Sequence, residues 1–521
     1  MHDLLTEPLI GIRRGDQAAR ASLPEVLAQL ARGELDAYTG QRAHQADPWH
    51  VFTVQLAASI LARRPDTRAD DPPVDFGFWR DGLLDLAEGQ VSAWHLVAAD
   101  ATSPALLQHP LTSEKELVDK FKPKDPKART PDELDVLVSS KNHDLKMARS
   151  RGDDAEAWIY AVLLYQTISG FFGNGNYGVV RMNSGTGSRP VVSVVPSLHP
   201  AARFRDELRR LCALRDNVVR KGFGYGSRGV VLTWLKKWDR TDHQWLPGDL
   251  EPWFIEACRP LRLVSQGSSI NALGAVSQAR QVGPKTPDGG DVGDPWIPIN
   301  TQNKKGRTAL TVGARGWTPA LVTSLMFEDG YEASPLQAVL HGEGTLMLAA
   351  SVVARGQGST EGFHRIILPI PARVRPRLLQ REQRDVLGKA AQALLRDADE
   401  LRRTVRFALI VLTEGGPDKA DIGADAVKRW VDARVGPLEQ SWHGPYFEHL
   451  WRIAEEGEEE VRRSWRSHLL VLGRKTLQRA LQDLPQPSNR RWRARVRADA
   501  TFVASLRKKG WPLLTEQEDL A

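Results

Sequence analysis

The sequence changes its pattern near residue 375, and this change limits the possible folds more than any other feature. Earlier residues alternate strand-like runs, glycine-rich loops and single helices. Later residues form four amphipathic helical segments, at residues 374–412, 425–440, 449–484 and 489–510. The length of 521 residues also exceeds what one hydrophobic core usually supports. We therefore predict the α+β class, with a large mixed α/β domain at residues 1–371 and a C-terminal four-helix bundle at residues 372–521.

Three helices in the first domain have recognisable start signals. Ser22-Leu23-Pro24-Glu25 combines an N-cap serine, an early proline and a capping glutamate, and Gly33 ends that pattern. A buried helix is expected after Asp47-Pro48, through the apolar run at residues 50–61. Thr130-Pro131-Asp132-Glu133 starts a short helix that we expect to stop near residue 139. His44 and His50 flank the buried helix, and core or capping roles suit them better than a metal site.

A loop between Ile168 and Val195 is rich in glycine and asparagine, and it surrounds a short expected strand at residues 177–182. So little side chain lets a backbone approach a ligand closely, as at a groove floor or a phosphate. The same composition is typical of a flexible hairpin. Composition alone leaves both interpretations open.

Two further segments are expected to project from the first domain. Strand-like runs at residues 345–354 and 363–370 are joined by residues 355–362, which predicts a hairpin with a glycine-hinged tip. At this tip Gln357 suits insertion beside base pairs, or it is an ordinary exposed residue. Residues 264–300 predict an extended loop or inserted arm, with Asp288, Asp291 and Asp294 as turn residues, and a basic cluster at residues 303–307 precedes an expected strand at residues 308–312.

All of the excess positive charge lies in the C-terminal part. The whole chain has 71 Lys and Arg against 64 Asp and Glu, and residues 371–521 hold 29 against 22 of these. Such an excess favours a polyanion partner, although it is also common on helical domains. The densest patch is the group of arginines around Trp492, which tracks a phosphate backbone or forms a solvated face opposite the acidic run at residues 455–460.

Several classes of protein are excluded or disfavoured by the sequence. It contains no P-loop, no GxGxxG after a strand, no GxSxG elbow and no HExxH motif, so we expect no enzyme activity. Cys212 and Cys258 form no CxxC pair, and the longest apolar runs are shorter than the roughly 20 residues that cross a bilayer. We expect a cytoplasmic protein with no membrane association, no metal and no cofactor.

Five features, taken in order, resemble CasA, the family of large subunits of type I-E CRISPR Cascade. They are the opening LLTEPLIGIR, the helix HVFTVQLAASIL, the loop with RMNSGTGSRP, the hairpin tip ARGQGSTEG and the terminal helical bundle. The resemblance implies an N-terminal α/β domain of unusual fold that recognises the PAM and docks on Cascade, followed by a bundle that contacts DNA. The expected partners are the backbone, small and guide-end subunits, the CRISPR guide RNA, PAM-containing double-stranded DNA and a helicase-nuclease.

The resemblance also assigns roles to particular residues of this sequence. The loop that approaches the PAM from the minor groove matches Gly173, Asn174, Gly175 and Asn176, and the hairpin that wedges into the duplex matches Arg355, Gln357, Gly358 and Ser359. A PAM-contacting cation matches Lys305 or Arg307. The loop at the end of the guide matches Lys141, Asn142, His143 and Lys146, and the bundle contacts DNA through Arg490, Arg491, Arg493, Arg495 and Arg497.

Two departures and two alternatives accompany this resemblance. Some relatives carry a cysteine-rich zinc knuckle before the lysine strand, and this chain has no cysteine there. An arginine in place of the lysine would present a bidentate fork rather than a point charge, which leaves the PAM preference open. The alternatives are a scaffold subunit that does not read the PAM and a free-standing nucleic-acid enzyme with dispersed catalytic residues.

Overall fold

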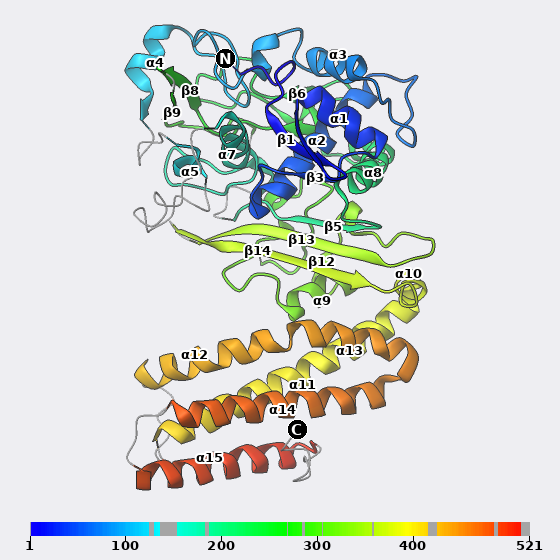
Figure 1. Ribbon diagram of the computed structural model, residues 1–521, viewed down its shortest axis with the longest axis vertical. Coiled ribbons are helices and arrows are strands. Elements are labelled where there is room, and N and C mark those ends of the chain that lie inside the picture. The colour runs from blue at the N-terminus through cyan, green and yellow to red at the C-terminus, as the bar shows by residue number, and fades with distance from the viewer. Residues whose placement is uncertain are drawn as a thin grey trace. The chain divides into compact units, whose positions relative to one another are not determined.

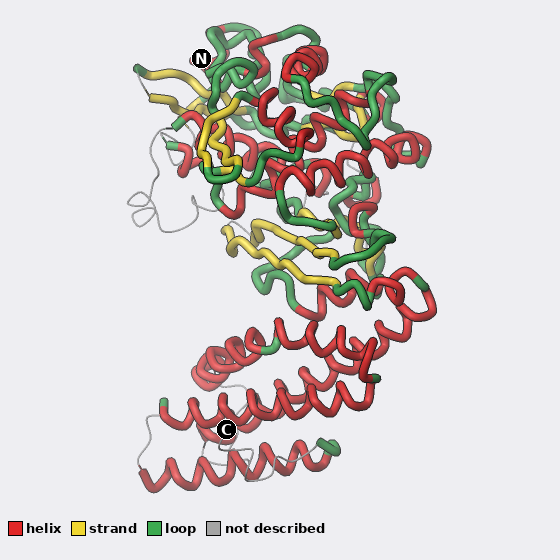
Figure 2. Tube along the Cα trace, turned by 45° about the vertical axis from the view of Figure 1, so that its right-hand side comes forward, coloured by secondary structure: helices red, strands yellow, loops and turns green. Residues whose placement is uncertain are grey.

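The computed structural model describes residues 2–123, 130–135, 154–182, 187–267, 269–283, 287–304, 306–356, 359–414, 425–483 and 488–511. The chain divides into two compact units (Figure 1). The first unit comprises residues 1–317 and 330–369, and the second comprises residues 318–329 and 370–521. Residues 318–329, which precede the predicted domain boundary, are therefore grouped with the C-terminal helices. Figure 2 shows helices mixed with short strands in the first unit and helices throughout the second, which confirms the α+β class.

The helices of the first unit begin where local capping dictates. In the first of them, the Ser22 amide donates to the Glu25 carboxylate at 2.7 Å, and Gly33 ends the helix with φ = 86°, as predicted. Glu133 caps Thr130 in the same way at 3.0 Å. The helices are α1 (Leu23–Arg32), α2 (Ala43–Ala62), α3 (Phe76–Leu86), α4 (Glu114–Lys120), α5 (Pro131–Leu134), α7 (Ala155–Thr167) and α8 (Pro200–Arg220).

Two predicted helix boundaries were wrong. Helix α2 starts at Ala43, before Asp47-Pro48, because the Gln45 side chain accepts from the Arg42 amide at 2.9 Å and closes a capping box one turn earlier. Helix α5 ends at Leu134 rather than near residue 139, because Asp135 has an extended backbone.

Small sheets complete the first unit. In three of them the strand orders are β2-β1-β3, β4-β9-β8 and β11-β10-β12, and β6 pairs with β7 in parallel. The strands are β1 (Ile10–Arg14), β2 (Gln17–Ala21), β3 (Ala37–Tyr38), β4 (Lys122–Pro123), β6 (Val230–Leu232), β7 (Leu250–Ile255), β8 (Leu261–Gln266), β9 (Ser269–Gly274), β10 (Ile299–Asn300), β11 (Thr308–Ala309) and β12 (Tyr331–Glu332).

The long hairpin is made of β13 (Leu346–Gly356) and β14 (Ser359–Ile370), and β13 also pairs antiparallel with β5 (Val191–Val195). The prediction of a hairpin is confirmed. The connection between its strands is shorter than the predicted residues 355–362, because β13 continues to Gly356 and β14 begins at Ser359. Gln357 and Gly358 lie outside the described residues. This sheet places the hairpin directly beside the segment that follows the glycine-rich loop.

Three other expectations need correction. The expected strand at residues 177–182 is absent, and Val180–Met182 forms a 3-10 turn instead, because the Glu256 carboxylate accepts from the Val180 amide at 2.9 Å. The segment at residues 264–300 is not one long arm, because β8 and β9 pair in register from Leu261 to Gly274. The strand expected at residues 308–312 is limited to Thr308–Ala309.

Buried ion pairs hold the first unit together. Glu207 of α8 is fully buried and accepts from Arg203 Nε at 2.9 Å, His50 Nε2 at 2.9 Å and Trp296 Nε1 at 2.7 Å. Arg203 also binds Asp47. In a separate buried contact, His44 Nε2 hydrogen-bonds to the Asp135 carboxylate at 2.7 Å. Both histidines therefore have core roles, as predicted.

The second unit is a helical bundle around one long central helix. Helix α11 packs against α12, α13, α14 and α15, and α9 also packs on it. The predicted helix at residues 449–484 is interrupted at Gly457, whose φ of 86° and ψ of 160° suit only glycine. The helices are α9 (Pro319–Phe327), α10 (Arg375–Leu379), α11 (Arg381–Glu414), α12 (Asp425–Ser441), α13 (His443–Glu456), α14 (Glu458–Gln482) and α15 (Ser488–Lys508). Among the described helices, none has the length and apolar character needed to span a bilayer.

Candidate nucleic-acid interface

The glycine-rich loop closes into a tight turn at the surface of the first unit. The Phe172 amide donates to the Asn176 carbonyl at 3.0 Å, and the Asn176 amide donates to the Gly173 carbonyl at 3.0 Å. Gly173 has φ = 106° and Gly175 has φ = 77°, conformations that favour glycine. Asn174 between them is exposed. The loop therefore presents backbone and a short amide side chain to solvent.

The two glycines differ in what surrounds them. A Cβ added to Gly175 would lie 2.8 Å from Val276 Cβ and 3.3 Å from the Ser277 carbonyl oxygen, whereas a Cβ on Gly173 would meet nothing within 4 Å. The Ser277 amide also donates to the Gly175 carbonyl at 2.9 Å. Gly175 therefore anchors the loop, while Gly173 leaves its outer face open to a ligand.

We expect Gly175→Ala to destabilise the first unit more than Gly173→Ala. Both substitutions force alanine into a left-handed backbone, which costs about 1–2 kcal/mol, but only the methyl group added at Gly175 also collides with its neighbours. Urea unfolding of the two variants measures the difference, which we expect to be about 1 kcal/mol or more. Equal losses in the two variants would contradict the assignment of Gly175 as the anchor.

An arginine–aromatic stack joins this loop to the hairpin. The Arg355 guanidinium carbon, near the end of β13, lies 3.8 Å from the centre of the Phe172 ring. The Arg259 guanidinium carbon lies 4.6 Å from the centre of that ring and 4.7 Å from that of Tyr165. Arg259 also donates to the Ser169 carbonyl at 2.9 Å. The structure thus brings the predicted loop and the base of the predicted wedge into direct contact.

The stack concentrates positive charge behind the loop. Arg259 and Arg355 are both buried. Burial is the main cause that lowers the pKa of Arg355 to about 10, and the positive charge of Arg259 is the second cause. Arg280, which is 7 % exposed, makes no hydrogen bond through its guanidinium within the described residues, but the charge of the buried Glu256 carboxylate acts on it. An anion near the loop would interact favourably with the buried charges of Arg259 and Arg355.

Two other buried arginines, Arg181 and Arg189, share the carboxylate of Asp294. Asp294 accepts from Arg189 Nη2 at 2.6 Å and lies 3.3 Å from Arg181 Nη1. Asp294 is a turn residue, as predicted, because its side chain accepts from the Trp296 amide at 2.9 Å and its carbonyl accepts from the Ile297 amide, and it is also a buried ion-pair partner. Asp291 pairs instead with Arg307 at 2.8 Å. The described residues hold no group of three or more acidic, histidine or cysteine side chains that suits a metal ion.

The two cation candidates differ in what the structure describes. Arg307 is 43 % exposed in its side chain, and it binds both Asp291 and Glu332 at 2.8 Å. These carboxylates raise the pKa of Arg307 and occupy much of its guanidinium. Lys305 lies outside the described residues, as do Lys141, Asn142, His143 and Lys146. Ser359 starts β14, and its side chain is not described.

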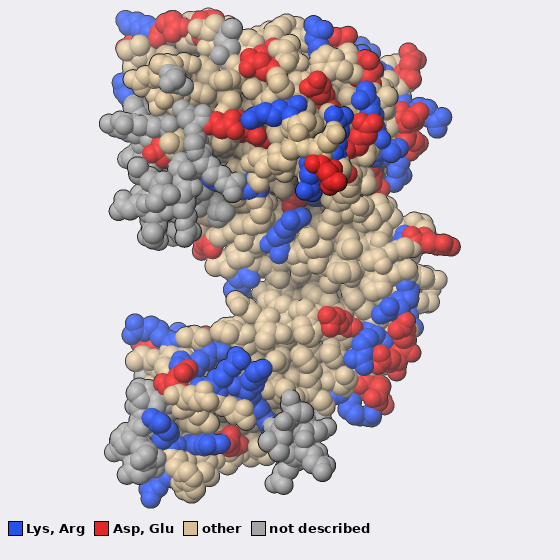
Figure 3. Space-filling model, in the orientation of Figure 1, with Lys and Arg blue, Asp and Glu red and all other residues tan. Residues whose placement is uncertain are grey.

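The arginines of α15 lie on the surface of the second unit. Arg491, Arg493, Arg495 and Arg497 are exposed, and only the helical backbone of Arg490 is described. The acidic run at residues 455–460 does not pair with them in the described structure: Glu455 binds Arg373, Glu456 binds Arg452 and Glu460 binds Arg463. Figure 3 shows Lys and Arg side chains gathered on the surface of this unit.

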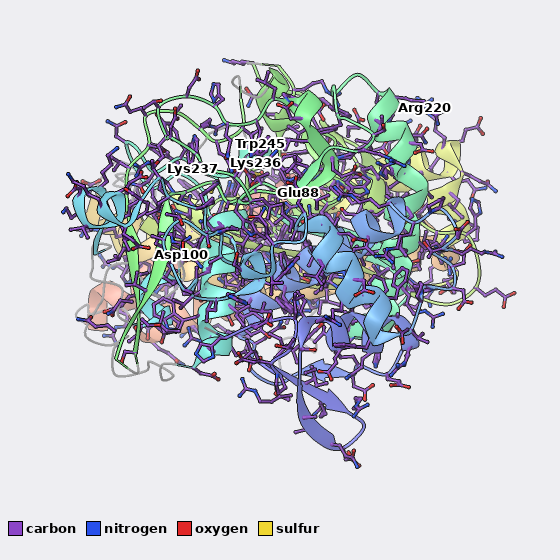
Figure 4. The ribbon with its side chains drawn as sticks, turned by 90° about the horizontal axis from the view of Figure 1, so that it is seen from above. Glu88, Asp100, Arg220, Lys236, Lys237 and Trp245 are labelled. Atoms are coloured by element: carbon purple, nitrogen blue, oxygen red, sulfur yellow. The ribbon has the colours of Figure 1, made fainter. Side chains whose placement is uncertain are left out.

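A separate basic group lies on the first unit and was not singled out in the sequence. Figure 4 labels Lys236, Lys237 and Trp245, and the Lys236 ammonium lies 5.4 Å from the centre of the Trp245 ring. The Gln244 side chain donates to the carbonyls of Lys236 and Lys237 at 2.8 and 2.7 Å. Trp245 is only 7 % exposed. This indole is therefore part of the structure rather than an open surface for a ligand.

Sequence reasoning also missed Phe172, Arg259 and Arg280. The alternation of aromatic residues and arginines near the loop was visible, but no local pattern indicated that these side chains stack. Arg259 is 93 positions from Gln166, whose side chain accepts from its amide, so only the folded chain brings this region together.

Comparison with known proteins identifies the fold of this chain through solved structures only. No family model and no curated protein matches the sequence. Among solved structures, Cse1 from Thermobifida fusca matches with a TM-score of 0.64 and 16% identity, covering 97% of this chain and 98% of that one. CasA (Cse1) from Thermus thermophilus matches with a TM-score of 0.61 and 14% identity, covering 97% and 99%. The chain has the Cse1 fold.

The Cse1 fold accounts for both units. A chain of a CRISPR RNA-guided surveillance complex also matches, with a TM-score of 0.53 and 15% identity over 96% of this chain and 99% of that one. Because each of these matches covers nearly the whole of both chains, the Cse1 fold includes the mixed first unit and the helical second unit.

Proposed function

We propose that this chain is CasA, the large subunit of a type I-E CRISPR RNA-guided surveillance complex. It binds double-stranded target DNA, recognises the PAM through the minor groove and opens the duplex to start R-loop formation. Two features support this proposal: the Cse1 fold, and the stack of Arg355 on Phe172 at 3.8 Å. The stack carries the argument because it couples the loop that would read DNA to the hairpin that would open it.

The proposed mechanism divides the work between guide and protein. The guide RNA reads the target sequence by base pairing, and the protein tests a few base pairs and destabilises the duplex locally. A backbone loop at Gly173–Asn176 approaches the minor groove, whose pattern of acceptors is degenerate, so several PAMs should be tolerated. Gln357 then wedges beside the PAM and stabilises unstacked bases. The buried cations Arg259 and Arg355 favour the approach of the phosphate backbone.

The remaining residues take supporting roles in this proposal. Lys305 or Arg307 contacts the PAM, and Lys141 to Lys146 help to anchor the subunit at the end of the guide. Arg490, Arg491, Arg493, Arg495 and Arg497 contact DNA phosphates from the bundle. The partners are the other Cascade subunits, the guide RNA, the target DNA and a helicase-nuclease that is recruited after opening. The chain itself performs no catalysis in this scheme.

We expect Gln357→Ala to slow strand opening about tenfold while changing duplex encounter by less than about twofold, because a wedge acts on the unstacked state. The measurement uses the reconstituted guide-RNA complex, a library of sequences flanking the target, and separate readouts of binding and strand opening. Gln17→Ala is the matched control, because Gln17 is an exposed glutamine on another hairpin of the first unit.

Each alternative has its own outcome in this assay. A scaffold subunit would leave flank preference independent of this chain and unchanged by Gln357→Ala. Equal losses in encounter and opening would remove the wedge role. Cleavage of DNA or RNA by the purified chain with magnesium or manganese would establish an enzyme instead.

A further inference from the structure

The ribbon formed by β1 and β2 projects from the first unit with both of its faces in solvent. Residues 13–20 are all exposed, and Figure 4 shows this ribbon, in blue, extending away from the body of the unit. A hairpin of two strands is marginally stable in water by itself. Here its base is fixed, because the buried Glu156 carboxylate accepts from the Gly11 amide at 2.9 Å and β1 pairs with β3. The ribbon is therefore a fixed projection.

The hydrogen-bond pattern leaves a row of backbone groups of β2 without a neighbouring strand. Among the described strands, β2 pairs with β1 alone. The carbonyls of Gly11 and Arg13 accept from the amides of residues 36 and 39, which flank β3, so these two residues of β1 face away from β2. Arg13 lies opposite Ala18, and Gly11 lies opposite Arg20. Because opposite residues of an antiparallel pair both face inward or both face outward, Ala18 and Arg20 present N–H and C=O groups to the free edge.

This edge lacks the features that usually prevent an exposed strand from pairing with another chain. Natural edge strands are commonly blocked by a proline, a bulge or a charged side chain. Strand β2 contains no proline, and its five residues pair with β1 in an unbroken register. Its one charged side chain, Arg20, is engaged elsewhere, because its Nη2 donates to the Leu9 carbonyl at 2.6 Å and lies 3.4 Å from Glu156. The free edge of β2 is therefore open to another strand.

The charges beside the free edge favour an acidic partner. Arg13 and Arg14 are exposed, and as neighbours in a strand they lie on opposite faces of the ribbon. Arg13 is opposite Ala18, whose methyl group is small enough to let the arginine side chain reach across β2. Asp16 at the turn is the only acidic residue among residues 13–20. A strand added at this edge meets one arginine on each face, so two consecutive acidic residues match the pattern.

We propose that the free edge of β2 binds an extended acidic segment of a partner protein as an added strand. The main-chain groups of Ala18 and Arg20 hydrogen-bond to the partner backbone, and Arg13 and Arg14 pair with its acidic side chains. An edge that alternates donors and acceptors matches a peptide backbone, which carries both, rather than a phosphate backbone, which only accepts. The ribbon contains none of the residues assigned above to DNA or to the guide, so this docking surface is independent of the proposed function.

The test measures binding of the full chain to fluorescent cyclised hairpin peptides by anisotropy. The acidic probe has the outer strand Thr-Val-Glu-Glu-Val-Thr, and cyclisation lowers the entropic cost of ordering it. Replacing both glutamates of the probe with lysine should weaken binding about fivefold or more, because two attractive charge pairs become repulsive. Hydrogen exchange then locates the contact: the acidic probe should slow exchange of the Ala18 and Arg20 amides and leave that of Ala19, which faces β1, unchanged.

Variants of the chain separate the backbone contact from the charges. Ala18→Pro removes one outward N–H and leaves the pairing with β1 intact, so it should weaken binding of the acidic probe about 2- to 12-fold, the loss expected for one hydrogen bond. Ala18→Ser is the matched control, because it keeps the amide. The double variant Arg13→Ala and Arg14→Ala should reduce the preference for the acidic over the lysine probe to less than about twofold, and it tests the proposal even if Ala18→Pro fails to fold. Circular dichroism verifies that each variant is folded.

Three results would overturn the inference. The first is a wild-type chain that does not bind the acidic probe. The second is binding without slower exchange at Ala18 and Arg20, which would place the peptide on a face of the ribbon rather than at its edge. The third is oligothymidine that binds more tightly than the acidic probe and slows exchange of the same two amides, which would point to a nucleic acid as the occupant.

Discussion

Replacing Glu207 with alanine should lower the free energy of unfolding of the first unit by about 3–5 kcal/mol. Burial opposes ionisation of this carboxyl, but Arg203 and His50 outweigh it and hold the pKa of Glu207 far below its ordinary range. Burial and the Arg203 charge also lower the pKa of His50, so the neutral ring donates its Nε2 proton to Glu207. Removing the carboxylate leaves Arg203 with one remaining carboxylate, Asp47, and leaves Trp296 Nε1 without its acceptor.

Urea unfolding combined with pulsed hydrogen–deuterium exchange measures this loss in the first unit alone. Asp85→Ala is the matched control, because the Asp85 side chain is 62 % exposed and its ion pair with Arg64 should contribute less than about 1 kcal/mol. Should Glu207→Ala fail to fold, Glu207→Gln retains the shape and should show a smaller loss. Equal stability of Glu207→Ala and Asp85→Ala would contradict the central role of this network.

Replacing Asp397 with asparagine should destabilise the helical unit by about 1.5–3 kcal/mol at neutral pH. Asp397 of α11 is 2 % exposed and accepts from Arg462 at 2.7 Å and from Arg466 at 2.8 Å, both on α14. The two arginines remain partly solvated, at 36 % and 20 % side-chain exposure, so the loss should be smaller than for Glu207.

The ion pairs of Asp397 with Arg462 and Arg466 should also make the stability of the helical unit depend on pH. Burial raises the pKa of Asp397, but the hydrogen bonds from Arg462 and Arg466 outweigh it, and the pKa falls below its ordinary value of 3.8. A carboxyl with a lowered pKa stabilises the folded state fully above its unfolded pKa, and this contribution is lost as the pH falls through the folded pKa. The gap between wild type and Asp397→Asn should therefore be constant above about pH 5 and shrink below pH 3.8.

Unfolding of both proteins across this pH range gives the measurement. Glu460→Gln is the matched control, because its ion pair with Arg463 is more than half exposed on both sides. A gap that is independent of pH would show that Asp397 acts through packing rather than through its charge.

The sequence by itself determined the elements whose signals are local. The capping box at Ser22 and Glu25 placed the start of α1, because a cap involves only neighbours along the chain. The change to amphipathic helices near residue 375 indicated the helical second unit, and two strand-like runs joined by a glycine-rich connection indicated the hairpin of β13 and β14. Boundaries were predicted less accurately, because the competing cap at Gln45 and the glycine at Gly457 moved two helix ends.

Only the tertiary structure decided which of these elements meet. The contact between Phe172 and Arg355 joins residues far apart in the chain, and no periodicity encodes such a partner. The same is true of Glu207, which binds His50 and Trp296 from distant segments. It is also true of Asp294, whose turn is local but whose two arginine partners come from elsewhere in the chain. Burial makes these pairings strong, and burial is a property of the folded chain rather than of any local segment.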